Sequence, residues 1–238
     1  MDTQEKILNE LLEKQNAGTL KAKDRYDIPA QDMPAQDGVE RRSNMNEVAL
    51  GYTETQARLE AMRCLQCRNA PCMEGCPVRI RIRDFVTSIA DGNFKEALGI
   101  IKENSLLPAV CGRVCPQEVQ CQETCTVGRK FKDPEKSVSI GRLERFVADH
   151  YGNEDVTPKV APPTGKKVAV IGSGPGGIVV AADVRRAGHE VTVFEAFHKP
   201  GGVMIYGIPE FRLPKQIVQE EIDVLEKMGV KIVCNFIV

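Results

Sequence analysis

The sequence predicts an α-helical, cysteine-rich domain followed by a partial α/β domain of the Rossmann type. Three observations predict this order. Eight of the nine cysteines fall into two short groups, apolar residues recur at helical spacing up to about residue 150, and short apolar strands alternate with helices after a Pro- and Gly-rich linker. We place the helical domain at residues 1–155, the linker at 156–165, and the incomplete α/β domain at 166–238.

Composition and charge narrow the class of protein. The 238 residues carry 32 Lys and Arg against 33 Asp and Glu, a net charge of −1 that argues against a nucleic-acid-binding module. No apolar run approaches the roughly 18 residues of a membrane span. The acidic, amphipathic start has no signal-peptide core, which predicts a cytoplasmic protein whose cysteines are not paired in disulfides.

Helical periodicity accounts for most of the first domain. We expect helices over residues 4–16, from Thr53 toward Cys64, from Ile82 to a stop at Gly92, from Asn93 through Ile101, and over about 138–150. Thr53 with Gln56, and Asn93 with Glu96, have the spacing of N-terminal capping residues. Residues 17–45 are polar, contain two prolines, and are expected to be extended.

One acidic residue interrupts the apolar stripe of the last of these helices. Glu144 shares that stripe with Leu143 and Val147. Either Glu144 lies at the edge of the stripe and reaches water, or it is buried. A buried carboxylate needs a compensating partner, which a metal would supply.

The two cysteine groups carry the strongest chemical signal. The first is C-x2-C-x4-C-x3-C followed by proline, and the second is C-x3-C-x5-C-x3-C; their members are Cys64, Cys67, Cys72 and Cys76, then Cys111, Cys115, Cys121 and Cys125. Such tight spacing favours iron–sulfur clusters over zinc, over reactive thiols and over disulfides, since structural zinc typically uses two knuckles separated by a dozen or more residues. One group could lend a ligand to the site of the other, as in two-cluster ferredoxins.

Cations near such a cluster would balance its negative charge. Five arginines lie close to the first cysteine group in the sequence, although each one taken singly is typical of a solvated surface residue: Arg63, Arg68, Arg79, Arg81 and Arg83.

The second domain opens with a glycine-rich turn. Strands are expected at 167–171, at 191–194 and from Lys231, and helices are expected up to about Gly188 and from Pro214. The turn fits G-x-G-x-x-G and consists of Gly172, Ser173, Gly174, Pro175, Gly176 and Gly177. It follows a strand, opens a helix, and precedes an acid at the end of the next strand, Glu195, which could accept a hydrogen bond from a ribose hydroxyl. The unit predicts a dinucleotide site with a pyrophosphate at the helix N-terminus.

A second glycine pair lies just beyond the acid. The segments Lys199-Pro-Gly-Gly202 and Tyr206–Lys215 (YGIPEFRLPK) are interpreted as loops that approach a long cofactor such as FAD, with an ordinary surface loop as the alternative.

In combination these motifs resemble the glutamate synthase small-subunit family. Its relatives include the amino-terminal half of dihydropyrimidine dehydrogenase, sulfide dehydrogenase and NADH-dependent ferredoxin:NADP oxidoreductase. The resemblance runs from about Gly51 to the end of the chain. It implies a helical domain with two [4Fe-4S] clusters, followed by an FAD-binding module. It also implies that electrons pass from NADPH through FAD and the clusters to a large catalytic subunit or a ferredoxin-like partner. The role that it implies is in glutamate biosynthesis.

The resemblance also assigns residues. It implies one cluster on Cys64, Cys67, Cys72 and Cys125, and a second on Cys76, Cys115, Cys121 and Glu144, which leaves Cys111 unligated. Spacing alone would choose Cys111 over Glu144, so both stay open. For FAD the resemblance points to the glycine turn, Glu195, Gly202, Val203, Arg212 and the backbone of Val238.

Members of this family continue well beyond the point where this sequence ends. We therefore expect the chain to be a fragment or split subunit, to lack the NADPH site, and to be inactive alone. No nucleophilic catalytic residue is predicted. An alternative of another class is a zinc-stabilised interaction module without catalysis.

Overall fold

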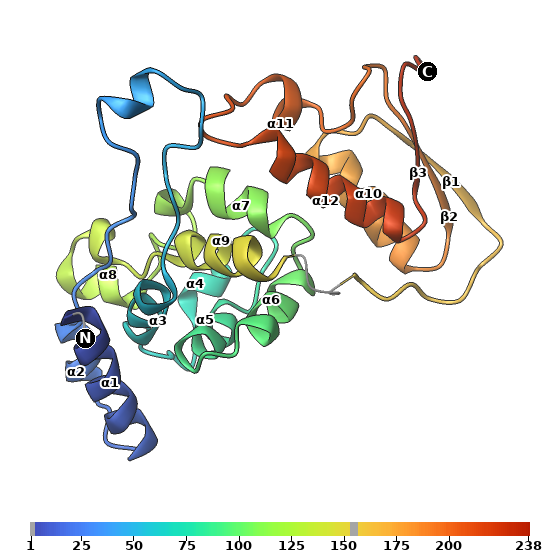
Figure 1. Cartoon of the computed structure of the whole chain (residues 1–238). Coiled ribbons are helices and arrows are strands. Elements are labelled where there is room, and N and C mark those ends of the chain that lie inside the picture. Colours follow the sequence, from blue (N-terminus) through green and yellow to red (C-terminus); the bar gives the residue numbers. More distant parts are fainter. Residues whose placement is uncertain (1–2, 153–156) are drawn as a thin grey trace. The chain divides into compact units, whose positions relative to one another are not determined.

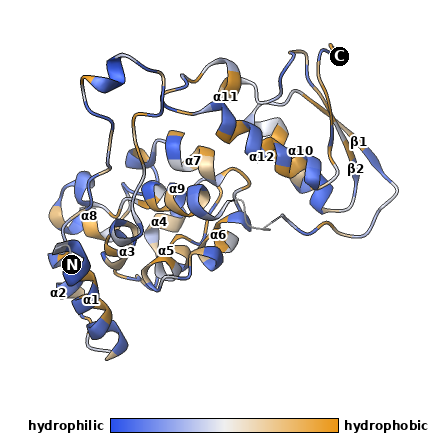
Figure 2. Cartoon of the chain, in the orientation of Figure 1, coloured by the Kyte–Doolittle hydropathy of each residue, from blue (hydrophilic) through white to orange (hydrophobic). Residues whose placement is uncertain are grey.

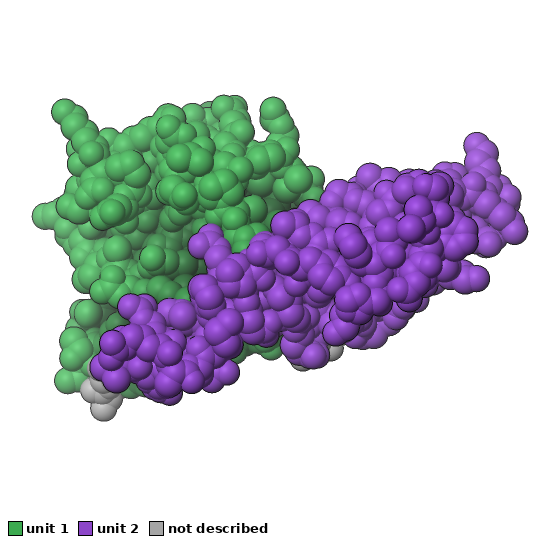
Figure 3. Space-filling model, turned by 90° about the horizontal axis from the view of Figure 1, so that it is seen from above, with its two compact units in different colours: residues 1–35, 49–154 green, residues 36–48, 155–238 purple. Residues whose placement is uncertain are grey.

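The computed structural model describes residues 3–152 and 157–238, which form two compact units. The first unit consists of Met1–Ala35 with Ala49–Glu154, and the second of Gln36–Val48 with Asp155–Val238 (Figures 1 and 3). The predicted fold class is confirmed: the first unit is helical and the second contains a small parallel sheet. No helix of the described residues is long and apolar enough to cross a membrane.

Helices build the first unit. They are α1 (Thr3–Asn16), α2 (Ala22–Asp27), α3 (Glu54–Met62), α4 (Pro71–Glu74), α5 (Ile82–Ala90), α6 (Phe94–Lys102), α7 (Pro108–Val114), α8 (Thr126–Phe131) and α9 (Ile140–Tyr151), with short 3-10 turns at Gln117–Val119 and Pro134–Lys136. Helices α3, α5, α6 and α9 contact one another around a core that includes Phe85, Leu98 and Phe146. Each such side chain contributes about 1.5–3 kcal/mol by leaving water. This core holds the loops that carry the cysteines.

The helix starts show which local signals decide the fold. Thr53 caps α3 as predicted, because its hydroxyl accepts from Gln56 N while the Gln56 side chain accepts from Thr53 N. Asn93 is the N-cap residue of α6, as predicted, but its side chain makes no capping hydrogen bond.

The prediction of an extended segment over residues 17–45 is wrong in part. Helix α2 and a 3-10 turn at Glu40–Arg42 lie within it. The Asp24 carboxylate accepts from Lys21 N and holds the first turn of α2, a local cap that the polar composition of the segment concealed.

The second unit alternates strands and helices. Its elements are β1 (Lys167–Ile171), α10 (Pro175–Arg186), β2 (Glu190–Phe194), α11 (Val203–Tyr206), α12 (Lys215–Lys227) and β3 (Lys231–Val233). The strand order is β1-β2-β3, and both pairs are parallel, with Lys167 opposite Glu190 and Thr192 opposite Lys231. Hydrophobic and hydrophilic residues occupy different sides of α12 (Figure 2), and Val218, Ile222 and Leu225 are its buried apolar residues. This arrangement puts the glycine turn and Glu195 at the carboxyl ends of adjacent strands.

Candidate iron–sulfur and dinucleotide sites

Four cysteine thiols from two separate parts of the chain line one pocket of the first unit. The pocket holds about 400 Å³ of empty space, part of it open to solvent, and its thiols are those of Cys64, Cys67, Cys72 and Cys125. Cys64 follows the end of α3, and Cys125 immediately precedes α8. These are the four residues that the family resemblance grouped around one cluster, and the other cysteines do not line the pocket.

The rest of the pocket wall is mostly apolar, with Arg83 and Thr126 as its polar residues. Its lining includes Ile82, Val86, Val127, Val138 and Ile140. Burial first, and the neighbouring cysteines of the pocket to a smaller extent, raise the pKa of Cys64 to about 11 and that of Cys72 to about 12. The thiols of Cys64 and Cys72 therefore stay protonated at neutral pH unless a positively charged group stabilises the thiolates, as metal ligation does.

The backbone around the first cysteine group is strained. Gln66, Ala70 and Arg79 adopt φ values of 52°, 36° and 53°, in the left-handed region that non-glycine residues seldom occupy. Each such residue costs on the order of 1–2 kcal/mol. Strain of this kind persists where surrounding structure fixes it and concentrates at functional sites. Here it allows a short loop to bring Cys64, Cys67 and Cys72 to one pocket.

A second set of thiols assembles through two close backbone contacts. A Cβ on Gly75 would lie 2.7 Å from the carbonyl oxygen of Gln120, and a Cβ on Gly112 would lie 2.7 Å from Arg145 N. Only glycine allows these approaches. Gly75 directly precedes Cys76, so its contact with Gln120 brings Cys76 beside Cys121. Gly112 directly follows Cys111, so its contact with Arg145 brings Cys111 beside Glu144 in α9.

Glu144 is buried, 6% exposed, so the interpretation that it reaches water is wrong. Burial first, and then the charges of Glu144 and Cys76, raise the pKa of Cys121 to about 12. The hydrogen bond with Cys115, then burial and the charge of Glu144, raise the pKa of Cys111. The same hydrogen bond lowers the pKa of Cys115 to about 7. Glu144 therefore lies beside both Cys111 and Cys121. The eighth ligand can be either Glu144 or Cys111 in this arrangement.

The donor sets fit clusters better than single ions. All nine cysteines are free thiols, so disulfides do not account for the two groups. Over residues 3–152 and 157–238, no three His, Cys, Asp or Glu side chains are grouped as ligands of one metal ion. The first four thiols surround a space instead of a point, and thiolates are the ligands that iron–sulfur clusters use.

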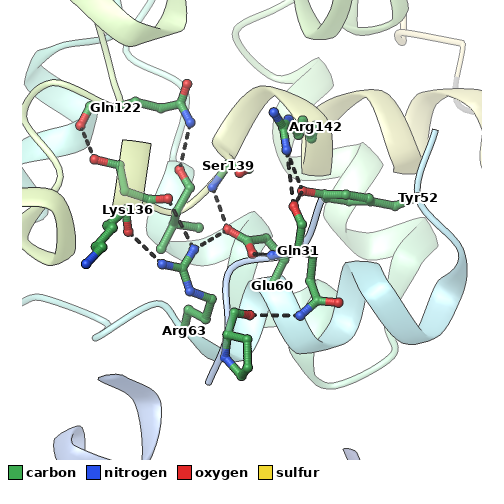
Figure 4. A network of polar contacts seen from close by, with 11 residues as sticks. Gln31, Tyr52, Glu60, Arg63, Gln122, Lys136, Ser139 and Arg142 are labelled. Atoms are coloured by element: carbon green, nitrogen blue, oxygen red, sulfur yellow. Dashed lines mark hydrogen bonds and ion pairs between the residues drawn. The ribbon is translucent and has the colours of Figure 1, made fainter. Parts of the chain in front are cut away.

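A network of buried polar side chains links separate segments of the chain next to the cysteine-bearing loops (Figure 4). Glu60 is fully buried; its carboxylate accepts from Arg63 Nη1 at 2.5 Å, from Ser139 N at 2.8 Å and from Gln31 N at 2.9 Å. Arg63 Nη2 also donates to the carbonyl of Lys136 at 2.6 Å. The network joins the end of α3, just before Cys64, to the start of α9, which carries Glu144.

Of the five arginines singled out from sequence, Arg83 lines the thiol pocket, and three of the five have carboxylate partners. Arg63 belongs to that network, Arg81 pairs with Glu103 and Asp84, and Arg83 pairs with Asp84. Sequence reasoning missed another cation, which contacts the main chain of Cys64 directly. Arg25 in α2 donates from Nη1 to the carbonyls of Met62 and Cys64, both at 2.9 Å. No local signal links these residues, because almost forty positions separate them.

The glycine turn of the second unit has the backbone of a dinucleotide site. Gly172 has φ +89°, and a Cβ on Gly177 would lie 2.1 Å from the Gly172 carbonyl oxygen, so close helix–strand packing requires glycine. A Cβ on Gly172, Gly174 or Gly176 would meet nothing within 4 Å. The turn therefore leaves open space at the N-terminus of α10, where a phosphate group fits.

Glu195 is held in place by its own neighbours. Its carboxylate accepts hydrogen bonds from Ser173 N at 2.9 Å, from the Ser173 hydroxyl, and from Phe197 N at 2.9 Å. Burial acts to raise the pKa of Glu195, but these hydrogen bonds outweigh it and hold the pKa below its usual range. The acid is thus ionised and fixed at the end of β2, as an acceptor for a ribose hydroxyl must be.

The segment Tyr206–Lys215 folds around one ammonium group. Lys215 Nζ donates to the carbonyls of Met204 at 2.8 Å, of Leu213 at 3.2 Å and of Ile208. The Glu210 carboxylate accepts from Lys215 N at 3.2 Å at the start of α12. Val203 at the start of α11 and Arg212 in the loop are both exposed. A Cβ on Gly202 would lie 2.8 Å from Gly174 Cα, so the second glycine pair lies against the first turn.

We expect Lys215→Met to loosen this loop. The variant leaves three carbonyls without the charged donor, at a cost of about 1.5–3 kcal/mol for hydrogen bonds to a charged group. Amide hydrogen exchange over residues 203–214 measures the effect as faster exchange. Lys227→Met, at the other end of α12, is the matched control and leaves that exchange unchanged; equal exchange in both variants contradicts the role of Lys215.

Comparison with known proteins agrees with this geometry. Residues 41–156 match the family model described as dihydropyrimidine dehydrogenase domain II, 4Fe-4S cluster, and residues 170–213 match an NAD(P)-binding Rossmann-like domain. The chain is 43% identical to the NAD-dependent dihydropyrimidine dehydrogenase subunit PreT of Escherichia coli K12 over 194 residues, which are 80% of this chain and 46% of that protein.

Two further relatives bear on function. The chain is 37% identical to the putative oxidoreductase UacF of E. coli K12, over 80% of this chain and 30% of that protein. It is 34% identical to the glutamate synthase [NADPH] small chain of E. coli K12, over 82% of this chain and 41% of that protein. The chain thus spans less than half the length of each of these relatives.

Proposed function

The chain belongs to the family that contains PreT and the glutamate synthase small chains, and from that membership we propose that it is the electron-transfer part of an NAD(P)H-dependent iron–sulfur flavoprotein. Two [4Fe-4S] clusters and FAD are its proposed cofactors. The observation that carries the proposal is the pocket in which three thiols from the segment after α3 and one from the residue before α8 meet within a mostly apolar wall. Clusters at such sites carry single electrons, and the protein sets their potential through ligands, hydrogen bonds and burial.

The proposed ligands follow the two sets of thiols. Cys64, Cys67, Cys72 and Cys125 would hold the first cluster in the pocket, whose mostly apolar wall would surround part of it. For the second cluster we propose Cys76, Cys115, Cys121 and Glu144. The close approach of Cys76 to Cys121, and the burial of Glu144 beside Cys121, support this set.

For the second unit we propose FAD as the nucleotide. The glycine turn from Gly172 to Gly177 would take the pyrophosphate, and the Glu195 carboxylate would take a ribose hydroxyl. Gly202, Val203, Arg212 and Val238 are proposed as further contacts, and the exposure of the last three leaves them accessible to a cofactor. In this proposal NAD(P)H binds elsewhere in the complete assembly.

The partner subunit is the finer question. Glutamate synthase is the leading expectation from the sequence motifs, with a large catalytic subunit as partner. The higher identity to PreT, 43% against 34%, favours a dihydropyrimidine dehydrogenase-type partner instead. Sulfide dehydrogenase and ferredoxin:NADP oxidoreductase subunits stay as alternatives. The zinc-stabilised interaction module is a further alternative, although no ligands of a single metal ion are grouped among the described residues.

Nucleotide binding and cluster reduction together test the proposed function. We expect anaerobically purified chain to bind FAD, with NADPH and NADH failing to displace it, and to give cubane-type electron paramagnetic resonance (EPR) signals when dithionite reduces it. Gly177→Val, which places a side chain against the Gly172 carbonyl, is expected to abolish FAD binding and leave the EPR signals. Displacement of FAD by NADPH contradicts the flavin assignment, and a reduced protein without EPR signals contradicts the electron-transfer role.

The eighth ligand has its own test. We expect Glu144→Ala to lower the iron content and to change the EPR spectrum of one cluster, because one iron loses its carboxylate. Cys111→Ala, which removes the neighbouring thiol, is expected to retain the iron and the spectrum. A Glu144→Ala protein with full iron and an unchanged spectrum rejects Glu144 as the ligand. If Cys111→Ala instead loses iron and changes the spectrum, the eighth ligand is Cys111.

A further inference from the structure

Arg25 contacts the main chain beside the first thiol pocket from a segment outside the matched 4Fe-4S domain, which begins at residue 41. It lies in α2 and is half-buried. Its Nη1 atom donates to the carbonyl oxygens of Met62 and Cys64. Carbonyls at the end of a helix have no partner within the helix and carry the negative end of its dipole, so a cation is favoured there. Arg25 thus fixes the main chain at the point where the first ligand leaves α3.

The charge of Arg25 lies directly beside the main chain of Cys64, because its Nη1 atom is 2.9 Å from the Cys64 carbonyl oxygen. Arg63, Arg81 and Arg83 have carboxylate partners that offset their charges, and this holds for Arg83 although it lines the pocket. Arg25 forms no ion pair with any residue that the structure describes, although Asp91 attracts it. Its positive charge is therefore available to the pocket.

The N-terminal segment is built to hold this guanidinium. Lys14 in α1 pairs with Asp24 in α2 at 2.7 Å, and Asp24 also caps α2. Ile28 is buried, and Gln31 N donates to the buried carboxylate of Glu60. These contacts attach both sides of Arg25 to the helical unit.

We infer that Arg25 is a positioning residue that raises the reduction potential of the first cluster by holding a positive charge beside Cys64. The inference rests on the proposed function, because it requires a cluster in that pocket. Reduction adds one negative charge to a cluster, and a nearby cation stabilises the reduced form more than the oxidised form. The segment before residue 41 thereby becomes part of the electron-transfer site.

The test is an EPR-monitored redox titration of the anaerobic, cluster-loaded chain. The signal of the first cluster is the one that Cys72→Ala removes. We expect Arg25→Met to reduce the ratio of reduced to oxidised first cluster about tenfold at the wild-type midpoint, which is 59 mV for a one-electron couple. The second cluster is expected to keep its midpoint. Arg25→Lys, which retains the charge, is expected to stay close to wild type.

Arg58→Met is the matched control. Arg58 is an arginine of α3 that also donates to a helix-end carbonyl, that of Ala90, but its recorded contacts include no cysteine. An unchanged first-cluster midpoint in Arg25→Met, or an equal shift in Arg58→Met, overturns the inference while leaving the proposed function intact. If Arg25→Met fails to retain the first cluster, retention in both Arg25→Lys and Arg58→Met supports the inference, and loss in either overturns it. Wild-type protein without iron and sulfide instead removes the proposed function, and the inference with it.

Discussion

Replacing Cys125 with alanine is expected to remove about half of the iron and about half of the visible absorbance of anaerobically purified protein. Cys125 shares its pocket with Cys64, Cys67 and Cys72, although it belongs to the second cysteine group of the sequence. Removing one thiolate leaves an iron without a protein ligand, and the cluster of that pocket is lost. Iron analysis and absorbance near 400 nm measure the change.

The pattern among variants tests the crossing of ligands between the two groups. Cys72→Ala and Cys125→Ala should leave the same residual EPR signal, and Cys121→Ala should leave the other one. Cys234→Ala is the matched control, since Cys234 lies outside both groups, and it should retain all the iron. A residual signal that Cys125→Ala shares with Cys121→Ala, and not with Cys72→Ala, contradicts the proposed ligand sets.

Replacing Glu60 with leucine is expected to destabilise the helical unit by about 3–5 kcal/mol. The carboxylate is fully buried and accepts from Arg63, Ser139 and Gln31. Its loss leaves the buried guanidinium of Arg63 uncompensated, and removing one partner of a buried ion pair costs far more than removing an exposed one. Urea unfolding under anaerobic conditions, followed by far-ultraviolet circular dichroism, measures the free energy.

Two further variants separate the network from a general effect of the substitution. Glu54→Leu makes the same change on the same helix at an exposed residue whose contact with Arg58 spans 4.0 Å, and it should cost less than about 1 kcal/mol. Glu60→Leu combined with Arg63→Met should recover part of the loss, because no charge is then left buried. Equal losses for Glu54→Leu and Glu60→Leu would show that the network does not stabilise the unit.

Sequence patterns predicted the elements whose signals are local. Thr53 and Gln56 cap α3 because both partners lie within one turn, and the periodicity of α9 placed Glu144 on an apolar stripe where the structure buries it. The glycine turn was equally readable, because its conformation depends on the absence of a Cβ at Gly172 and Gly177.

Long-range contacts escaped prediction. Asn93 has the composition of a cap but makes no capping hydrogen bond, and Lys21 with Asp24 holds a helix that polar composition hid. Arg25 and Cys64 are joined only by tertiary structure, as are Glu60 and Ser139. Neither partner of such a pair is unusual in its own sequence neighbourhood, so spacing carries no signal for it.

The composition of the inorganic groups tests the whole account most directly. Anaerobically purified chain is to be assayed together for iron, acid-labile sulfide and zinc. We predict one sulfide for each iron, as the 4Fe-4S formula requires, with zinc at trace level. Stoichiometric zinc without sulfide, in protein whose helical unit is folded, would contradict the assignment of both thiol sets to clusters.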